Sequence, residues 1–344
     1  MNEYKVDSII QDCVNEVGPT YGRKMMTGYV RSKGLGLSGN QVSKSLRRVN
    51  PVNHSRRRED TVRRQNPVPY YAPYFGNKLH CDQNEKLAMY GCTFSAMSDG
   101  CSSKIVKLFS RPKKNAVIIY SHFRDVLVRE GIWDMVRVDH GTESCLMLFI
   151  QNLLRNERGN ISCEPYMQTC SRQNLPAERK WPEVNQHVVY PIKETLVRME
   201  NGLLIHMHDP VVQFCVSFIT MNVAEVELKR VIGSWNSGRI LDNRIPDVVA
   251  GATKRIRPLT PTIVPSVQDA IQMYTSAGGV LTSECSFGND PLADDGALRS
   301  RHDTEFVQNN PSFSQIFENV IIGNGALMET AILSFINITR YLSP

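Results

Sequence analysis

The order of apolar segments between residues 75 and 195 restricts the fold of this chain more than any other feature. The first segments have the period of strands, and the later ones alternate between the strand period and the helix period. Strands followed by strand–helix units predict a mixed α/β sheet with helices on its faces. The predicted strands are 78–87, 89–100, 104–110, 135–139 and 167–170, and the predicted helices are 116–130, 143–154 and one that begins near Pro176.

The first 50 residues predict a helical domain of the helix-turn-helix type. Apolar residues recur at helical spacing from Val6 to Val17, and two more helices are expected at 21–33 and 39–49. Ser38 follows a glycine-containing turn and is placed to cap the last of these helices. Two short helices with a basic end are similar to a DNA-binding helix-turn-helix, although a plain helical hairpin has the same pattern.

Positive charge is concentrated between residues 44 and 64. The chain of 344 residues has a formal net charge of +6, and only Glu59 and Asp60 oppose the basic residues of this stretch. Such a cluster favours nucleic acid, while a solvated surface and a nuclear-import signal are the alternatives. Residues 51–74 also contain four prolines, which predicts an extended linker. The basic residues are Lys44, Arg47, Arg48, Arg56, Arg57, Arg58, Arg63 and Arg64.

The chain after residue 195 predicts a mainly helical extension over 196–344, without a catalytic motif. Two stretches, 245–266 and 287–303, are rich in turn-forming residues and are expected to be irregular. The extension could hold substrate, form an oligomer interface or be purely structural. Its candidate helices are 192–199, 210–229, 267–276, 312–322 and 327–341.

The cysteine pattern is that of reduced thiols. Nine cysteines are scattered along the chain, with no CxxC pair and no spacing typical of zinc ligands. The N-terminus lacks the basic and apolar regions of a signal peptide, and no segment approaches the roughly 18 apolar residues of a membrane span. We therefore expect an intracellular protein without a membrane partner and, from the basic cluster, a nuclear one.

Three acidic residues lie in segments where burial of an ionised carboxylate would cost free energy unless a cation is bound beside it. Asp82 and Asp139 lie in segments predicted as buried strands, and Glu178 lies near the start of a predicted helix. Together, three carboxylates suit hard divalent ions and metal-assisted phosphodiester chemistry. Each one alone also fits an ordinary turn or surface position, and Asp99 competes with Asp82 for the first place.

Four motifs around these acids resemble the catalytic core of retroviral integrases, of related transposases and of the integrase-core proteins of animal and fungal genomes. The resemblance is strong over residues 75–190 and extends to the N-terminal helices. It implies a ribonuclease H-like fold, assigns the first ligand to Asp82 and leaves Asp99 to turn a hairpin. The motifs are His80-x-Asp82-x-Asn84-x-Lys86-Leu87, Asp99-Gly100-x-Ser102, Arg137-x-Asp139-x-Gly141-x-Glu143 and Ser171-x-x-Asn174-x-x-x-Glu178-Arg179-x-Trp181.

The chain departs from the family pattern in three ways. His140 replaces the common asparagine after the second aspartate, and Pro176 replaces a residue that is polar in many members. No zinc-binding module of His and Cys precedes the core, unlike in the retroviral enzymes. None of these departures removes one of the three carboxylates.

The resemblance implies two-metal catalysis on DNA. Asp82 would bind both of two Mg²⁺ or Mn²⁺ ions, Asp139 would bind one of them, and Glu178 would bind the other. DNA is the expected partner, and a homo-oligomer is expected on DNA ends. Contacts to DNA phosphates next to this site are expected from His140, Arg179 and Lys180.

These predictions divide the chain into four parts: a DNA-binding domain over 1–50, a linker over 51–74, an integrase catalytic core over 75–195 and the extension over 196–344. The expected function is that of an integrase or transposase, which cleaves DNA and transfers the strand. A domesticated, inactive DNA-binding protein of mobile-element origin and a ribonuclease H-like nuclease are the alternatives.

Overall fold

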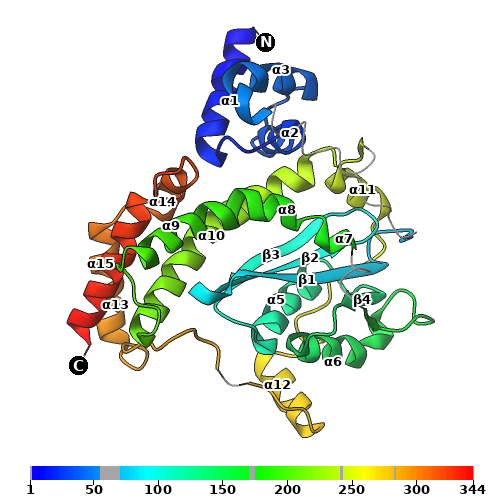
Figure 1. The fold of residues 1–344 in the computed structure, drawn as a ribbon. Helices are drawn as coiled ribbons and strands as arrows, with labels where there is room; N and C mark the ends of the chain where they lie inside the picture. The colour runs from blue at the N-terminus through cyan, green and yellow to red at the C-terminus, as the bar shows by residue number, and fades with distance from the viewer. Residues whose placement is uncertain (1, 55–69, 170–174, 241–242, 283, 344) are drawn as a thin grey trace.

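A five-stranded mixed sheet forms the centre of the protein in a computed structural model, which describes all residues except 1, 55–69, 170–174, 241–242, 283 and 344 (Figure 1). The strand order is β3-β2-β1-β4-β5. β2 runs antiparallel to both β1 and β3, while β4 runs parallel to both β1 and β5. The strands are β1 (Lys78–Leu87), β2 (Cys92–Asp99), β3 (Ile105–Arg111), β4 (Met135–Val138) and β5 (Tyr166–Gln168).

The two hairpins of the sheet are closed by local backbone features. Between β1 and β2 the chain forms the short helix η1 (Ala88–Tyr90), and Gly91 follows with a left-handed φ of 65°. At the end of β2, the buried carboxylate of Asp99 accepts hydrogen bonds from both the backbone and the hydroxyl of Ser102 and from the backbone of Gly76. Asp99 therefore holds the second hairpin turn together.

Helices cover both faces of the sheet and create two separate apolar cores. The helices α5 (Ala116–Arg129) and α6 (Cys145–Leu153) pack on one face, where Phe109 and Phe123 are buried. The long helix α10 (Pro210–Ser237) crosses the other face, above Ala96 and Leu108 (Figure 1). This arrangement confirms the predicted α/β fold of the ribonuclease H-like type.

Within the described part of the chain, α10 alone is long and apolar enough to cross a membrane by length and composition. It is buried between the sheet, the N-terminal helices and the C-terminal helices, however, and its apolar side chains belong to the larger of the two cores. Its composition is thus that of a central core helix.

The outer edge of β3 is occupied by side chains of the helices on either side. On one flank, Asn236 of α10 accepts from the backbone N–H of Ile105 and donates to its carbonyl. Glu225, also of α10, accepts from the backbone N–H of Ser110. On the other flank, Arg129 of α5 donates to the carbonyl of Val106. Several backbone groups that an edge strand would leave open are therefore already bonded.

Four consecutive helical segments connect the sheet to α10. They form an almost continuous helix interrupted by one π-helical turn, in which Asn185 accepts a hydrogen bond of 2.7 Å from the Asn84 side chain on β1. The predicted helix near Pro176 is therefore present, as the four residues of α7. The segments are α7 (Leu175–Glu178), α8 (Trp181–Val184), the π-helical η5 (Asn185–Val189) and α9 (Tyr190–Asn201).

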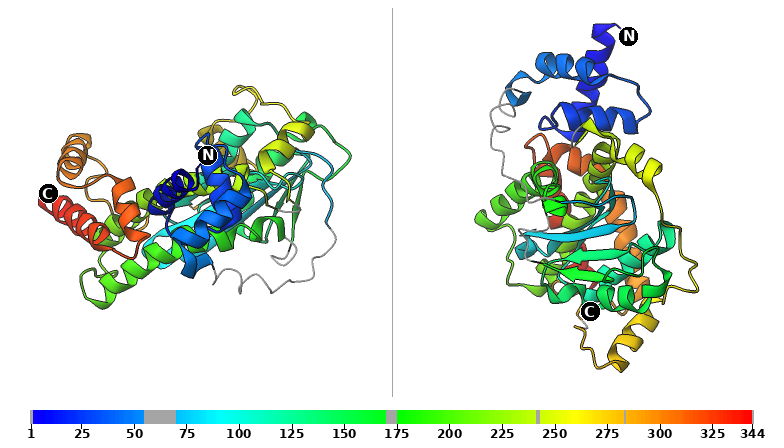
Figure 2. Two further views of the ribbon diagram at one scale, coloured as in Figure 1. Left: turned by 90° about the horizontal axis from the view of Figure 1, so that it is seen from above. Right: turned by 90° about the vertical axis from the view of Figure 1, so that its right-hand side faces the viewer.

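The N-terminal residues form the three predicted helices, α1 (Glu3–Val17), α2 (Arg23–Ser32) and α3 (Gly39–Val49). Ser38 caps α3 in a complete capping box with Gln41, as the sequence predicted. We call residues 2–50 the N-terminal module. Figures 1 and 2 show this module at one end of the molecule, with α2 lying against α10.

The seam between α2 and α10 is unusually close at one residue. A Cβ atom added to Gly28 would overlap the carbonyl oxygen of Ser234 and would lie 2.8 Å from the backbone nitrogen of Gly238. Only a glycine allows the two helix backbones to approach in this way. The N-terminal module is thus fitted to the core by backbone contact.

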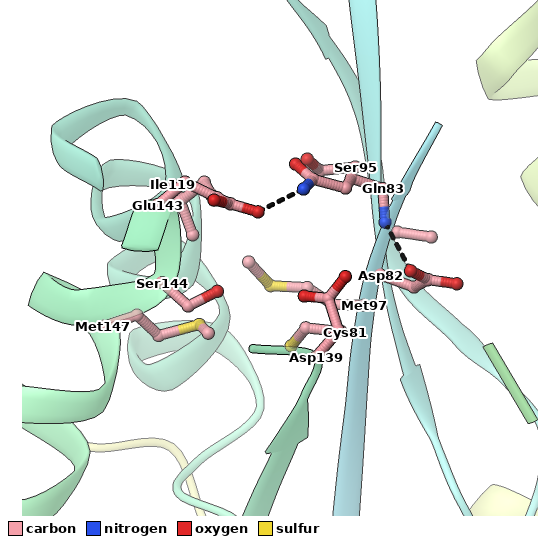
Figure 3. Close-up of a pocket in the computed structure, with 11 residues that line it drawn as sticks. Cys81, Asp82, Gln83, Ser95, Met97, Ile119, Asp139, Glu143, Ser144 and Met147 are labelled. Carbon is pink, nitrogen blue, oxygen red and sulfur yellow. Dashed lines mark hydrogen bonds between the residues drawn. The ribbon is translucent and has the colours of Figure 1, made fainter. Parts of the chain in front are cut away.

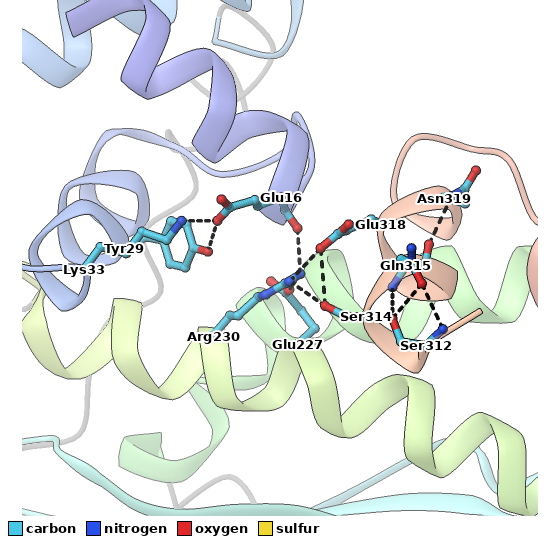
Figure 4. Close-up of polar contacts among 10 residues, drawn as sticks. All are labelled: Glu16, Tyr29, Lys33, Glu227, Arg230, Ser312, Ser314, Gln315, Glu318 and Asn319. Atoms are coloured by element: carbon cyan, nitrogen blue, oxygen red, sulfur yellow. Dashed lines mark hydrogen bonds and ion pairs between the residues drawn. The ribbon is translucent and has the colours of Figure 1, made fainter. Parts of the chain in front are cut away.

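A network of charged side chains around Arg230 of α10 reinforces this seam (Figure 4). Arg230 donates to the carbonyl of Glu16 at 2.7 Å and to the carboxylate of Glu318 at 3.0 Å. It also lies 3.5 Å from the carboxylate of Glu227, which accepts a hydrogen bond from Tyr21. One side chain of the core therefore contacts both the N-terminal module and the C-terminal helices.

The chain after α10 is helical, as predicted, but two of its helices were not expected. The stretches 245–266 and 287–303 contain α11 and most of α13, so the prediction that they are irregular was wrong for these residues. Pro246 occupies the first turn of α11, and Asp295 caps α13 through the N–H groups of Ala297 and Leu298, so residues typical of turns here start helices. The helices are α11 (Pro246–Thr253), α12 (Val267–Ser276), α13 (Gly296–Asn309), α14 (Phe313–Val320) and α15 (Ala326–Leu342).

Candidate active site

Asp82 lies in the middle of β1, opposite Ala96 of β2, with both carboxylate oxygens hydrogen-bonded. The indole N–H of Trp181 donates to Oδ2 at 2.9 Å, and the backbone N–H of Gln83 donates to Oδ1 at 2.9 Å. Burial raises the pKa of Asp82 to about 6, the two hydrogen bonds oppose this shift, and the charges of Asp139 and Glu178 add to it. Asp139 and Glu178 are therefore close enough to Asp82 for their charges to act on it.

Asp139 follows the last residue of β4, and Asp82 and Asp139 both line one small cavity (Figure 3). The cavity has a volume of about 20 Å³, enough for a single water molecule. It opens between the middle of β1 and the short helix η2 (Thr142–Ser144). Two of the three predicted acids thus line one cavity, one from the middle of β1 and one from the carboxyl end of the neighbouring parallel strand β4, and ligands of α/β folds gather at such strand ends.

Glu178 is the last residue of α7 and does not line this cavity. Burial raises the pKa of its carboxyl group. The hydrogen bond from Trp181, three residues further along, holds the chain that follows α7 against Asp82. Glu178 is therefore kept near the site by its neighbour and contributes a negative charge there.

The donor set fits hard divalent ions, which prefer carboxylate oxygens. In the chain outside the gaps named above, no three His, Cys, Asp or Glu side chains are already arranged to hold a metal ion. A cation between Asp82, Asp139 and Glu178 would offset both the burial and the neighbouring negative charges that raise the pKa of Asp82. Asp82, Asp139 and Glu178 are the residues that would hold it.

Asp99, the rival of Asp82, has a different environment. Its carboxylate accepts four hydrogen bonds, the fourth from the indole of Trp133 at 2.9 Å. It is fully buried and has no free face toward the cavity. Asp99 therefore serves the hairpin, and Asp82 is the acid that faces the site.

The profile of the integrase core domain family matches residues 70–246, just over half of the chain. The chain belongs to the integrase core domain family. The match begins before β1 and runs to the start of α11, so the family region of this integrase-core protein includes α10.

One solved structure with a similar fold to this integrase-core protein is the cryoEM structure of the simian T-cell lymphotropic virus intasome in complex with PP2A regulatory subunit B56 gamma. The two share 10% sequence identity at a TM-score of 0.40, over 73% of this chain and 75% of that chain. No curated protein matches the sequence.

The cavity of the integrase core is lined by a third acid, which stood out in the sequence only as a motif residue. Glu143 lies in η2, is 8% exposed and accepts a hydrogen bond from the side chain of Gln83 (Figure 3). The only signal in the sequence was the position of Glu143 four residues after Asp139. One turn of the chain can bring two side chains at this spacing to the same cavity. Gln83, next to Asp82, was not singled out at all.

The basic residues predicted to bind nucleic acid have different surroundings. Lys44, Arg47 and Arg179 are exposed. Arg48 is exposed but engaged, since it forms a two-pronged ion pair with Asp7 at 2.7 and 2.9 Å. Arg56, Arg57, Arg58, Arg63 and Arg64 lie outside the described residues, as do Ser171 and Asn174 of the last motif.

Lys180 differs most from its predicted role. Its side chain is 1% exposed, its amine donates to the carbonyl of Pro176, and it faces the ring of Trp235 at 5.5 Å. Burial lowers the pKa of this amine to about 7. In this conformation Lys180 supports the turn after α7, so the prediction of a phosphate contact for it was wrong. His140, by contrast, is exposed beside Asp139.

Replacing Trp181 with phenylalanine should raise the pKa of Asp82 above its value of about 6. The indole N–H stabilises the ionised carboxylate, and losing a hydrogen bond to a charged group is worth about one pKa unit. A ¹³C NMR titration of the aspartate carboxyl carbons, in metal-free protein, would measure the shift. Trp235→Phe is the matched control, since that indole donates to the carbonyl of Ser103 instead. An unchanged pKa in Trp181→Phe would mean that the indole does not tune Asp82.

Proposed function

We propose that this integrase-core protein cleaves DNA and joins DNA strands with the help of divalent metal ions, through Asp82, Asp139 and Glu178. The observation that carries this proposal is that the charges of Asp139 and Glu178 both raise the pKa of Asp82. The charges of an acid at a strand end and of an acid at a helix end act on a partly buried acid in the middle of a strand, and such an arrangement is costly without cations.

Bound Mg²⁺ or Mn²⁺ would supply an activated hydroxyl and would stabilise the leaving oxygen of the phosphodiester. Asp82 is suited to the central place, because β1 is the middle strand of the sheet and both oxygens are oriented by fixed hydrogen bonds. Asp139 and Glu178 flank it from different elements. The partly buried setting also limits competing water at the carboxylates.

DNA is the proposed substrate and partner. The exposed Lys44 and Arg47 on α3 and the exposed Arg179 next to Glu178 offer cations to a phosphate backbone. Action on two DNA ends would call for a homo-oligomer. A nuclear location follows from the same substrate.

The function is tested by joining a 3′-hydroxyl DNA end to a second duplex in the presence of Mg²⁺ or Mn²⁺. We expect Glu178→Gln to lower the rate by about 10²–10³-fold, because an oriented charge at the reacting phosphate is lost. Glu157→Gln, an exposed glutamate of the same core, is the control and should retain full activity. Full activity of Glu178→Gln, or activity in excess chelator, would contradict the proposal.

Two other functions remain testable with the same preparations. A domesticated DNA-binding protein would bind duplex DNA but would neither join ends nor bind Mn²⁺ at these carboxylates. A ribonuclease H-like nuclease would cleave RNA–DNA hybrids in preference to DNA ends. The presence of all three carboxylates, two of which act on Asp82 by their charge, favours the joining activity over the first of these.

A further inference from the structure

A chain of polar side chains leads from the end of β3 to the cavity of the candidate site. The guanidinium Nη2 of Arg111 donates to the side-chain oxygen of Gln83, and the side-chain nitrogen of Gln83 donates to the carboxylate of Glu143. Gln83 pairs with Ser95 across the sheet, Ser95 pairs with Phe109 of β3, and Arg111 lies two residues beyond Phe109 on the same face. The sheet register therefore aligns these groups.

This chain of side chains contains polar atoms that the described residues leave without a partner. Arg111 is 1% exposed, yet its Nε and Nη1 have no hydrogen-bond acceptor in the described chain. Ser95 is 5% exposed and lines the cavity, and its hydroxyl likewise has no partner among the described residues. Buried polar groups in this state are costly, so a ligand or water that bonds to them would be stabilised.

Glu143 has only one hydrogen-bond donor among the described residues, the neutral amide of Gln83. Its carboxylate thus retains lone pairs on the side of the cavity that Asp82 and Asp139 also line (Figure 3). The turn that returns it depends on Gly141, because an added Cβ there would lie 2.5 Å from Cδ of Glu143. The Gln83 amide and the turn at Gly141 therefore both fix the position of the Glu143 carboxylate.

We propose that Glu143 is a fourth carboxylate of the metal-binding site, held in place by Gln83 and Arg111. Glu143 binds the cation or its water shell from the cavity side, and Gln83 and Arg111 act as positioning residues. The unpartnered hydroxyl of Ser95 adds an oxygen to the same cavity. This inference rests on the proposed function, since it extends the same site beyond Asp82, Asp139 and Glu178.

Calorimetric titration of the full chain with Mn²⁺, in the absence of DNA, tests the role of Glu143. We expect Glu143→Gln to weaken Mn²⁺ binding by about 10–100-fold, and Arg111→Met to weaken it by about 10-fold through loss of positioning. Arg111→Met should leave the Tm unchanged or raise it, because it removes a buried charge with two unpartnered donors. Glu157→Gln, at an exposed position, should bind Mn²⁺ like the natural chain.

A second variant moves the Glu143 carboxylate without removing its charge. Gly141 has ordinary extended backbone angles, φ −75° and ψ 142°, which alanine also adopts. Gly141→Ala should therefore fold, displace the carboxylate of Glu143 and lower Mn²⁺ affinity by about 10-fold. Gly36→Ala is the matched control, since an added Cβ at Gly36 meets nothing within 4 Å.

The outcomes separate this inference from the proposed function. Weaker Mn²⁺ binding by Glu143→Gln and Gly141→Ala, with both variants folded, supports it. If Asp82→Asn loses Mn²⁺ while both of these variants bind it as tightly as the natural chain, the inference is overturned and the proposed function stands. If the natural chain itself binds no Mn²⁺, the proposed function fails and the inference fails with it.

Discussion

Asp82→Asn should abolish metal-dependent DNA joining, with a rate at least about 10³-fold below that of the natural chain. The charges of Asp139 and Glu178 both raise the pKa of Asp82. Replacing Asp82 therefore removes the central carboxylate of the proposed site. Residues that act as a unit lose nearly all activity when any central member is removed. The rate of joining a labelled 3′-hydroxyl DNA end in Mn²⁺ measures the effect.

The same substitution should make the metal-free protein more stable at pH 7. The folded-state pKa of Asp82, about 6, lies above its ordinary value of 3.8, so the stability that this group contributes is present at low pH and is lost as the pH rises through 6. The shift corresponds to about 3 kcal/mol, and asparagine forfeits about 1 kcal/mol of hydrogen bonding. We therefore expect the free energy of unfolding to rise by about 1–2 kcal/mol.

Urea unfolding at pH 4 and at pH 7 checks this second effect, because the gain should shrink as Asp82 becomes protonated in both states. Asp125→Asn is the control: Asp125 is exposed, and its contact with Lys107 spans 3.4 Å. A chain in which Asp82→Asn joined DNA at the natural rate would rule out the proposed role of the acids. Equal stability of variant and natural chain at pH 7 would show that the carboxylates do not strain the metal-free fold.

Gly28→Ala should separate the N-terminal module from α10 or lower the free energy of unfolding by about 3 kcal/mol or more. The added Cβ meets the backbone of α10 at Ser234 and Gly238, and backbone atoms of a packed helix cannot turn aside as a side chain would. Overpacking a close contact commonly costs about 1–3 kcal/mol, and a clash with backbone belongs at the upper end.

Two measurements distinguish the outcomes for Gly28→Ala. Urea unfolding reports the loss of stability, and small-angle scattering reports whether the module leaves the core while remaining folded. Gly39→Ala is the matched control in the same module, since its Cβ would meet only the Thr27 hydroxyl at 3.8 Å. A Gly28→Ala protein with natural stability and natural dimensions would show that α2 does not dock on α10 as described.

The sheet was predictable from sequence because its strands carry clear local patterns. The predicted segment 78–87 matches β1, and 104–110 differs from β3 by one residue at each end. The N-terminal helices were predictable for the same reason, since Ser38 marks the start of α3. The helices α11 and α13 were missed because their first residues, Pro246 and Asp295, are typical of turns as well as of helix starts.

The sequence predicted the candidate site only where its residues belong to a motif or have the chemistry of a metal ligand. Asp82 and Asp139, which line one cavity, stand out in the sequence, but Glu143 does not, because its position depends on how the turn at Gly141 folds. Burial was the other property that the sequence pattern did not reveal. Lys180 looked like a solvated cation beside Glu178 and is enclosed under Trp235, a contact between residues more than fifty positions apart.

The bonded outer edge of β3 has a consequence for how copies of this protein can assemble. A second chain that extended the sheet there would have to break the hydrogen bonds that Asn236, Glu225 and Arg129 make to the strand backbone. These side chains come from α5 and α10, the helices that build the two cores, so they cannot withdraw without loosening the fold. Edge-to-edge association through β3 is therefore disfavoured, and a multimer on DNA would be expected to form through its helical surfaces.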